Sequence, residues 1–274
     1  MSEKTVMEKN VRFLWQIGCK PEAEETHTSA KLNETQAFRR RIRMEPYCNP
    51  GKRVEIEVDG QRYLRHAIQT HFVGVGEDYV ELFRRYVQPV YQPGDLVAVS
   101  EKVAALCQGR VVRRSDIRVT PLARLLARCV HQTEAGPGMG LPIKMQFAIN
   151  ECGAGTVLWA AFRAAVDKLR GVYGTFYRLL GPEVRGLDGF YGKDNPAYAD
   201  LGIRIPAEPD RLCDAVYKAT GIRSFLVDAN GLGVELLGKA AVVTEPEEML
   251  TALVRDNPAG QERQLTPFIL IHRG

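Results

Sequence analysis

A hydroxyl, a carboxylate and an ammonium group follow one another at the end of a short apolar run, LVAVS (96–100). A glutamine, a glycine and an arginine follow within about two helical turns. These candidates are Ser100, Glu101, Lys102, Gln108, Gly109 and Arg110. Such a set can hold phosphate oxygens and a metal ion, because charged donors make strong hydrogen bonds to oxyanions and carboxylates bind hard cations. The alternative is an ordinary strand-to-helix connection with a surface Glu–Lys pair.

Acidic side chains stand among glycines in two later segments. GLDGF (186–190) contains Asp188, and VDANGLG (227–233) contains Asp228 and Asn230. Hard cations such as Mg²⁺ and Mn²⁺ take oxygen ligands, and sites that transfer phosphate use carboxylates to hold them. We therefore predict that Asp188 and Asp228 supply metal ligands. The alternative for each segment is a tight turn, which Asp-Gly and Asn-Gly pairs also favour.

Other residues capable of chemistry are scattered along the chain. The six cysteines include no CxxC pair that would bind zinc or run redox chemistry, so we expect reduced, mostly buried thiols in a cytoplasmic protein. His71 ends an apolar stretch, and a structural role is favoured for it over catalysis. The loop GPGMG (136–140) lacks the Lys-Ser/Thr ending of a Walker loop.

Apolar runs bounded by turns predict the strands that position these groups. VEIEV (54–58) alternates, Asp59-Gly60 favours a hairpin turn, and residues 63–75 supply the return strand. Further strands are predicted over residues 96–100, 224–233 and 264–272. Ligands in open sheets tend to bind where strands end, because backbone N–H groups and helix N-termini are exposed there.

Apolar residues at helical spacing predict the helices. Thr120 and Pro121 begin one of them, with a capping hydroxyl followed by a proline at the first helical position. Thr244 and Glu247 form a capping box before another. The predicted helices cover residues 79–87, 121–130, 156–170, 209–221 and 249–254. The succession of strand, helix, turn and strand up to residue 100 follows the pattern of an α/β unit.

The composition is that of a globular protein with a local site. Its 45% of apolar residues is too high for a disordered chain, and its formal charge of +4 is too weak to predict a nucleic-acid or membrane partner. No apolar run predicts a transmembrane helix, and no signal peptide is expected. Residues 1–45 are expected to form an N-terminal extension and residues 46–274 the main domain. An arginine cluster in the extension could bind RNA, although a solvated surface is favoured; it comprises Arg39, Arg40, Arg41 and Arg43.

The segment GDLVAVSEKVAALCQGRVV (94–112) resembles the early signature of the coenzyme F-420 γ-glutamyl ligase family. In that family, a strand after a Gly-Asp turn leads to a serine, a lysine and a Gly-Arg pair. The likeness continues in order through GLDG, IPAEPD (205–210) and VDANGLG, over roughly residues 65–240. It implies a homodimeric α+β protein with the ligase fold, in which mixed sheets and packed helices form one compact unit beside the N-terminal extension.

The resemblance also implies an activity. These ligases use GTP and Mn²⁺ or Mg²⁺ to join the amine of L-glutamate to a carboxylate on a deazaflavin coenzyme, and their two metal-binding aspartates correspond to Asp188 and Asp228. It thus implies a GTP- or ATP-dependent ligase that adds glutamate or a similar amino acid to a carboxylate acceptor. Lys102 and Arg110 would be catalytic and counter phosphate or carboxylate charge. The cofactor contacts would come from Ser100, Glu101, Gln108, Gly109 and Asn230.

The chain departs from the ligase pattern at several positions. Gly189 and Phe190 stand where the ligases have Ser-Asn, and Ala229 replaces a threonine. NGLGVE (230–235) replaces an arginine-containing stretch, and residues 120–180 cannot be matched to the ligases. These differences indicate a divergent branch with a changed acceptor. The alternative function is a non-catalytic or regulatory module that binds a small anion or nucleotide on the same scaffold.

Overall fold

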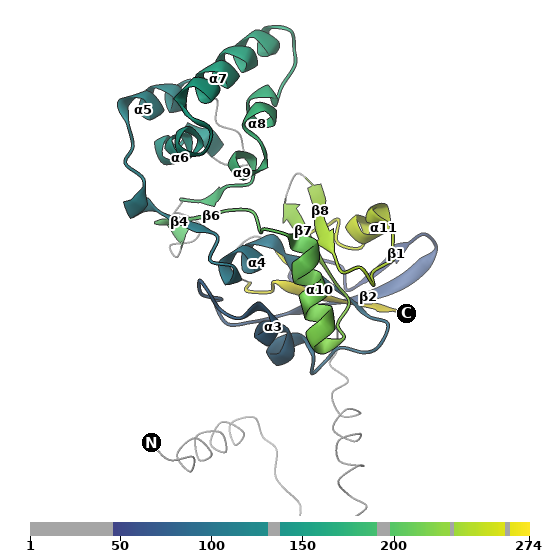
Figure 1. Cartoon of the computed structure of the whole chain (residues 1–274). Coiled ribbons are helices and arrows are strands. Elements are labelled where there is room, and N and C mark those ends of the chain that lie inside the picture. The colour runs from purple at the N-terminus through teal and green to yellow at the C-terminus, as the bar shows by residue number, and fades with distance from the viewer. Residues whose placement is uncertain (1–45, 131–137, 191–197, 231–232, 261–263) are drawn as a thin grey trace, which may run out of the picture. The chain divides into compact units, whose positions relative to one another are not determined.

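The computed structural model describes residues 46–130, 138–190, 198–230, 233–260 and 264–274. These residues form an α+β fold with a mixed six-stranded sheet, a small second sheet and packed helices (Figure 1). The α+β class predicted from the sequence is therefore confirmed. Cys19 and the arginine cluster lie outside the described residues. None of the described helices has the length and apolar character needed to cross a membrane.

The strands form two sheets. They are β1 (Glu55–Val58), β2 (Gln61–Ile68), β3 (Leu96–Ser100), β4 (Val111–Arg113), β5 (Asp188–Gly189), β6 (Leu201–Ile203), β7 (Ser224–Asn230), β8 (Gly233–Lys239) and β9 (Phe268–Arg273). The large sheet has the order β1-β2-β9-β3-β7-β8, and only its β3–β7 pair is parallel among the described strands. The small sheet has the antiparallel order β4-β6-β5.

The helices fall into two groups by their contacts. They are α3 (Tyr79–Leu82) with the π-helical turn Phe83–Val87, α4 (Glu101–Cys107), α5 (Pro121–Arg128), α6 (Pro142–Cys152), α7 (Ala154–Leu169), α8 (Thr175–Leu180), α9 (Pro182–Arg185), α10 (Pro209–Thr220) and α11 (Glu247–Ala252). Short 3₁₀ turns cover Arg114–Asp116 and Gly138–Gly140. α10 packs on β7, β8 and α3, whereas α5 to α9 pack on one another around their own apolar core (Figure 1).

The strands β1 and β2 form the predicted hairpin. Asp59 and Gly60 have φ angles of 52° and 73°, and two-residue hairpin turns of the I′ type require positive φ at both positions. The return strand ends at Ile68, earlier than the prediction of residue 75. Its pairing with β9 ends at Ile68, and further along the N–H groups of Gly74 and Gly76 bond to the Glu77 carboxylate and to the Leu106 carbonyl rather than to a strand.

The strand β3 explains why LVAVS is continuously apolar. Leu96 to Val99 are each at most 4% exposed, because β3 lies between β9 and β7 with helices packed on the sheet. Its parallel register with β7 sets Ser100 opposite Val227. The carboxyl ends of these two strands therefore meet at one edge of the sheet, where the chain leaves β3 for α4.

The helix α4 joins the large sheet to the small one. Ala105 and Leu106 pack against Ile203 of β6. Gly109, with a φ of 65°, ends the helix and turns the chain into β4. The first turn of α4 is thus fixed between the two sheets.

The strand β5 lies unusually close to β6. A Cβ atom added to Gly189 would lie 2.1 Å from the carbonyl oxygen of Leu201, and Gly189 has a φ of 88°. Only glycine fits such a position without a shift of the backbone. This close approach fixes the neighbouring Asp188 against β6.

Other predictions from the sequence were wrong or incomplete. α6 was missed, because its residues 143–148 are all buried and so show no one-sided apolar pattern. The predicted strand 224–233 is β7 followed by β8, which also went unpredicted. The capping box was wrong: Pro246, not Thr244, is the N-cap of α11.

An ion pair inside the protein ties the hairpin to the C-terminal region. The Arg65 side chain is fully buried, and its guanidinium donates to Asp256 Oδ2 at 2.9 Å and to the carbonyl of Leu253 at 3.1 Å. Burial would otherwise raise the pKa of Asp256, but Arg65 lowers it below its usual value. A buried guanidinium without its carboxylate is costly.

We predict that Asp256→Ala lowers the free energy of unfolding by about 3 kcal/mol, because it leaves the Arg65 charge buried without its partner. Asp256→Asn, which keeps an acceptor oxygen, should lose less. Urea denaturation measures both, with Asp200→Ala as a control because the side chain of Asp200 is 84% exposed. Equal losses for Asp256→Ala and Asp200→Ala would contradict the role given to Arg65.

Candidate functional site

The parallel register of β3 and β7 brings two acidic residues together. Ser100 is opposite Val227, so the next residues, Glu101 and Asp228, follow at the same edge of the sheet. The two carboxylates interact electrostatically, and Asp188 of β5 also acts on Glu101. Carboxylates from three separate segments thus converge at one place.

Lys102 supplies a cation that acts on two of these carboxylates, Asp188 and Glu101. It lies in the first turn of α4, and its ammonium forms an ion pair with Asp188 Oδ2. The other carboxylate oxygen of Asp188 accepts the backbone N–H of Gly189 at 2.8 Å. The side chains of Lys102 and Asp188 are 40% and 24% exposed, so the pair lies at the edge of solvent.

Two further residues, Lys144 and Tyr198, belong to this cluster and were missed in the sequence. Lys144 of α6 is 5% exposed and donates to the carbonyl of Leu187 at 3.0 Å, directly before Asp188. Tyr198 interacts electrostatically with Lys102 and Asp188. A lysine within the apolar segment PIKMQFAI (142–149) was a usable signal, because lysines are rarely buried without a partner. Tyr198 had no comparable signal.

Burial and charge shift the pKa values in this cluster. Burial, reinforced by the charge of Asp228, raises the pKa of Glu101 to about 8, although Lys102 opposes the shift. Burial would also raise the pKa of Asp188, but Lys102 and Lys144 lower it below its usual value. Burial lowers the pKa of Lys144, while Asp188 opposes that shift. Asp188 is therefore held in its ionised form.

The structure gives Gln108, Gly109 and Arg110 contacts away from Lys102. The Gln108 amide exchanges two hydrogen bonds of 2.8 Å with the backbone of Ala207. Arg110 forms an ion pair with Glu183 of α9. These contacts tie the end of α4 to the segment that enters α10 and to the helical group.

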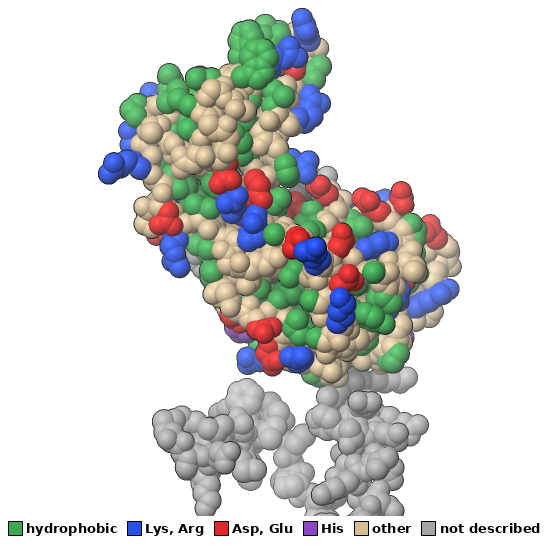
Figure 2. All heavy atoms as spheres, in the orientation of Figure 1, with side chains coloured by type: hydrophobic (Ala, Val, Ile, Leu, Met, Phe, Trp, Pro, Cys, Tyr) green, Lys and Arg blue, Asp and Glu red, His purple; other side chains and the backbone are tan. Residues whose placement is uncertain are grey.

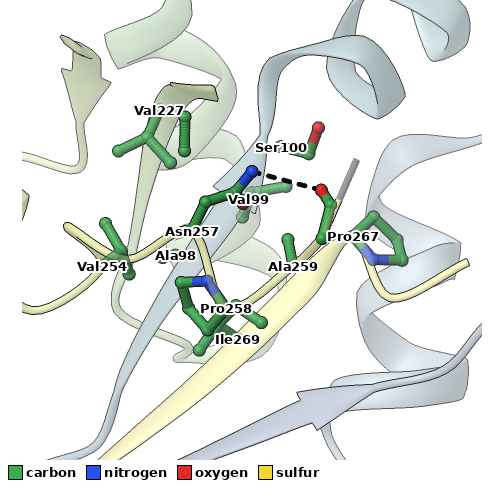
Figure 3. Close-up of a pocket in the computed structure, with 12 residues that line it drawn as sticks. Ala98, Val99, Ser100, Val227, Val254, Asn257, Pro258, Ala259, Pro267 and Ile269 are labelled. Atoms are coloured by element: carbon green, nitrogen blue, oxygen red, sulfur yellow. Dashed lines mark hydrogen bonds between the residues drawn. The ribbon is translucent and has the colours of Figure 1, made fainter. Parts of the chain in front are cut away.

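Ser100 lines a small cavity beneath the same sheet edge. The cavity measures about 40 Å³ and is walled mainly by apolar side chains, with Asn257 beside Ser100 (Figure 3). Asn257 is 5% exposed, its Nδ2 donates to the Gly260 carbonyl at 3.3 Å, and its Oδ1 has no partner. A buried acceptor calls for a donor, and a cavity of this size holds a water molecule or a small polar group. Neither the cavity nor Asn257 was predicted.

The residues predicted to bind a metal fit a protein-bound divalent cation poorly. Both carboxylate oxygens of Asp188 are engaged, one by Lys102 and one by Gly189. Among the described residues, no three His, Cys, Asp or Glu side chains are arranged to hold a metal ion. Asp228 lies beside Glu101, and the side chain of Asn230 is outside the described part of the structure. The chemistry of this site is therefore explained without a metal held by Asp188.

His71 has a local structural environment. Its ring nitrogens lie 2.6 Å from the Tyr86 hydroxyl and 2.7 Å from Glu77 Oε2. Glu77 in turn accepts the N–H of Gly74, in the segment that ends the hairpin. This arrangement stabilises the loop after β2 and agrees with the structural interpretation favoured for His71.

We predict that the stability of the wild-type protein falls as the pH rises from about 4.5 to 8 because of Glu101. Its carboxyl keeps its proton up to about pH 8 when folded, whereas the unfolded chain releases it near the ordinary value of 4.5. Glu101→Gln should therefore stabilise the protein at pH 8 by about 1–3 kcal/mol, with little effect at pH 4.5. Chemical denaturation at both pH values measures this. The exposed Glu248→Gln is the control, and the same pH response in both variants would refute the prediction.

No protein-family model matches the chain, and no curated protein matches it in sequence. We therefore derive its function from the residues of the site and from the motifs quoted above.

Proposed function

We propose that the chain is a nucleotide-dependent ligase that forms an amide between an amino acid, such as L-glutamate, and a carboxylate acceptor. The observation that carries this proposal is the convergence of Glu101, Lys102, Asp188 and Asp228, with the ammonium of Lys144 close by. Such a mixed cluster suits a reaction whose substrates include phosphates, carboxylates and an amine.

The reaction needs two steps, because an unactivated carboxylate does not react with an amine. In the first step, the acceptor carboxylate attacks the γ-phosphorus of GTP or ATP and releases the nucleoside diphosphate. In the second, the amine attacks the acyl carbonyl and releases phosphate. Positive groups lower the barrier by compensating charge on the phosphate oxygens.

The residues of the site divide these tasks. Lys102 contacts the transferred phosphate, because its side chain is partly exposed while Asp188 holds its ammonium in place. Glu101 accepts the proton that the attacking amine loses, since a pKa of about 8 suits a base working near neutral pH. Asp228 attracts the ammonium form of the incoming amino acid. Mg²⁺ or Mn²⁺ would arrive as the complex with the nucleotide.

The remaining predicted residues support this site from its edges. Ser100 and Asn257 offer polar atoms in the cavity beside β3, where a bridging water would donate to Asn257 Oδ1. Arg110 acts as a positioning residue through Glu183 rather than as a phosphate ligand. The contacts of Gly109 and Asn230 with the nucleotide stay predictions.

A specific observation favours the second function, a non-catalytic small-anion or nucleotide-binding module. The close approach at Gly189 leaves no room for the serine that the ligases carry at this position. The position after Asp188 thus requires glycine, so this chain cannot have the Ser-Asn pair that follows the aspartate in the ligases. A binding module predicts nucleotide binding without amide product.

The test is incubation with GTP or ATP, Mg²⁺ or Mn²⁺, L-glutamate and the deazaflavin carboxylate, followed by mass spectrometry. We expect a glutamyl adduct and nucleoside diphosphate in equal amounts. Lys102→Met should lower the rate at least about a hundredfold, because it removes the charge that faces the phosphate. The exposed Lys218→Met is the control. Nucleotide binding without product would favour the binding module, and absence of both would reject the ligase.

The described cysteines fit the proposal of a cytoplasmic protein. Cys48, Cys107, Cys129, Cys152 and Cys213 are all free thiols, and Cys48 and Cys213 are buried, whereas Cys129 is exposed. Burial raises the pKa of Cys213 to about 12, which keeps its thiol protonated and unreactive. We propose small-molecule substrates and no nucleic-acid or membrane partner.

We also propose that the protein is a homodimer whose interface includes the apolar face of α7. Leu158, Trp159, Phe162 and Leu169 are 46–90% exposed on this helix, and hydrophobic side chains gather over it in Figure 2. The rings of Trp159 and Phe162 contact each other at an interplanar angle of 31°, with centroids 5.8 Å apart. Exposed apolar patches of this kind mark interfaces.

The double variant Trp159→Glu, Phe162→Glu should shift the mass of the protein from dimer to monomer, because it places charges in the apolar face. Size-exclusion chromatography with light scattering measures the mass. Tyr217→Glu on α10 is the control and should stay dimeric. A monomeric wild type, or a dimeric double variant, would refute this interface.

A further inference from the structure

The strongest inference concerns the cation beside Asp188. We propose that the ammonium of Lys102 takes the place that a protein-bound divalent metal would have beside Asp188, and that Lys102 binds a phosphate oxyanion directly. Only the identity of the ligand as a nucleotide phosphate rests on the proposed function. The placement of the cation rests on contacts within the chain.

The coordination of Asp188 is the first argument. Asp188 Oδ2 pairs with Lys102 and Oδ1 accepts the N–H of Gly189 at 2.8 Å, so a metal ion at this carboxylate would have to displace or compete with the Lys102 ammonium. The carboxylate cannot turn without breaking the second bond. Gly189 is itself fixed by its close approach to Leu201. Asp188 is thus shaped to receive one ammonium from α4.

A second ammonium makes the same position unfavourable for a divalent cation. Lys144 is almost fully buried, donates to the carbonyl of Leu187 at 3.0 Å, and acts electrostatically on both Asp188 and Lys102. Lys144 thus adds a second positive charge that acts on the same carboxylate as Lys102. A Mg²⁺ or Mn²⁺ ion there would be repelled by both of them.

Lys102 also has the exposure that an anion receptor needs. Its side chain is 40% exposed, so ammonium N–H groups not directed at Asp188 can reach a ligand from solvent. Its position at the start of α4 places it next to the carboxyl ends of β3 and β7. Asp188 orients the ammonium, and Lys144 adds positive potential. Glu101 and Asp228 are acidic and counter part of this potential.

The first experiment titrates the full-length protein with Mn²⁺ alone and follows the free ion by electron paramagnetic resonance. We expect no stoichiometric Mn²⁺ site in the wild type. Lys102→Met should bind Mn²⁺ at least about tenfold more tightly than the wild type, because it removes the repelling charge and frees Asp188. Lys102→Met, Asp188→Asn should lose that gain. Lys102→Arg keeps the charge and should behave as the wild type, as should the surface control Lys218→Met.

The second experiment measures binding of inorganic pyrophosphate by calorimetry in the presence of EDTA. The wild type should bind without metal, and Lys102→Met should bind at least about tenfold more weakly, since a charge-assisted hydrogen bond is lost. Lys218→Met should match the wild type. Melting temperatures check that every variant is folded, and Lys102→Arg still tests the charge if Lys102→Met fails to fold.

Three results would overturn the inference: stoichiometric Mn²⁺ binding by the wild type that Asp188→Asn abolishes, no Mn²⁺ gain in folded Lys102→Met, or no pyrophosphate binding without metal. The outcome is separate from that of the ligase assay. The expected binding pattern without an amide product keeps this inference and rejects the ligase. An amide product together with a wild-type Mn²⁺ site at Asp188 does the reverse.

Discussion

The ion pair between Lys102 and Asp188 is the interaction on which the site depends. It links the first turn of α4, which follows the large sheet, to β5 of the small sheet. The charges of Asp228 and Asp188 both act on Glu101, and like charges that interact destabilise one another unless a cation intervenes. Lys102 is that cation. It does not fully compensate the burial of Glu101 and the repulsion from Asp228, so the pKa of Glu101 stays raised.

The scaffold serves this ion pair from several directions. The parallel register of β3 and β7 fixes Glu101 beside Asp228, and the packing of α4 on Ile203 fixes the lysine. The close contact of Gly189 with β6 fixes the aspartate. Gln108 and Arg110 hold the end of α4 through Ala207 and Glu183. Within the sequence motif, Glu101 and Lys102 thus form the site, whereas Gln108 and Arg110 fix the helix that carries Lys102.

Several elements of the fold could be predicted from the sequence, because their local residue patterns determine their structure. The Asp59-Gly60 turn, the buried strand LVAVS and the Thr120 cap all have the structure that their patterns indicate. α6 could not be predicted, since a helix buried on all sides has no periodic pattern.

The site itself was only half visible in the sequence. Glu101, Lys102, Asp188 and Asp228 were selected by residue type and position. Their pairing was not, because residues 86 positions apart meet only through tertiary packing, as Lys102 and Asp188 do. Asn257 was missed for the same reason, because it gains meaning only from its buried surroundings, whereas Lys144 could have been noticed as a lysine within an apolar segment.

The most direct test of the account is a double-mutant cycle on the free energy of unfolding, with Lys102→Met, Asp188→Asn and the two combined. If the ammonium of Lys102 is the cation of Asp188, the two effects are not additive, and the coupling energy is about 1 kcal/mol or more. If the effects add to within about 0.3 kcal/mol, the two side chains do not interact and the central claim is contradicted.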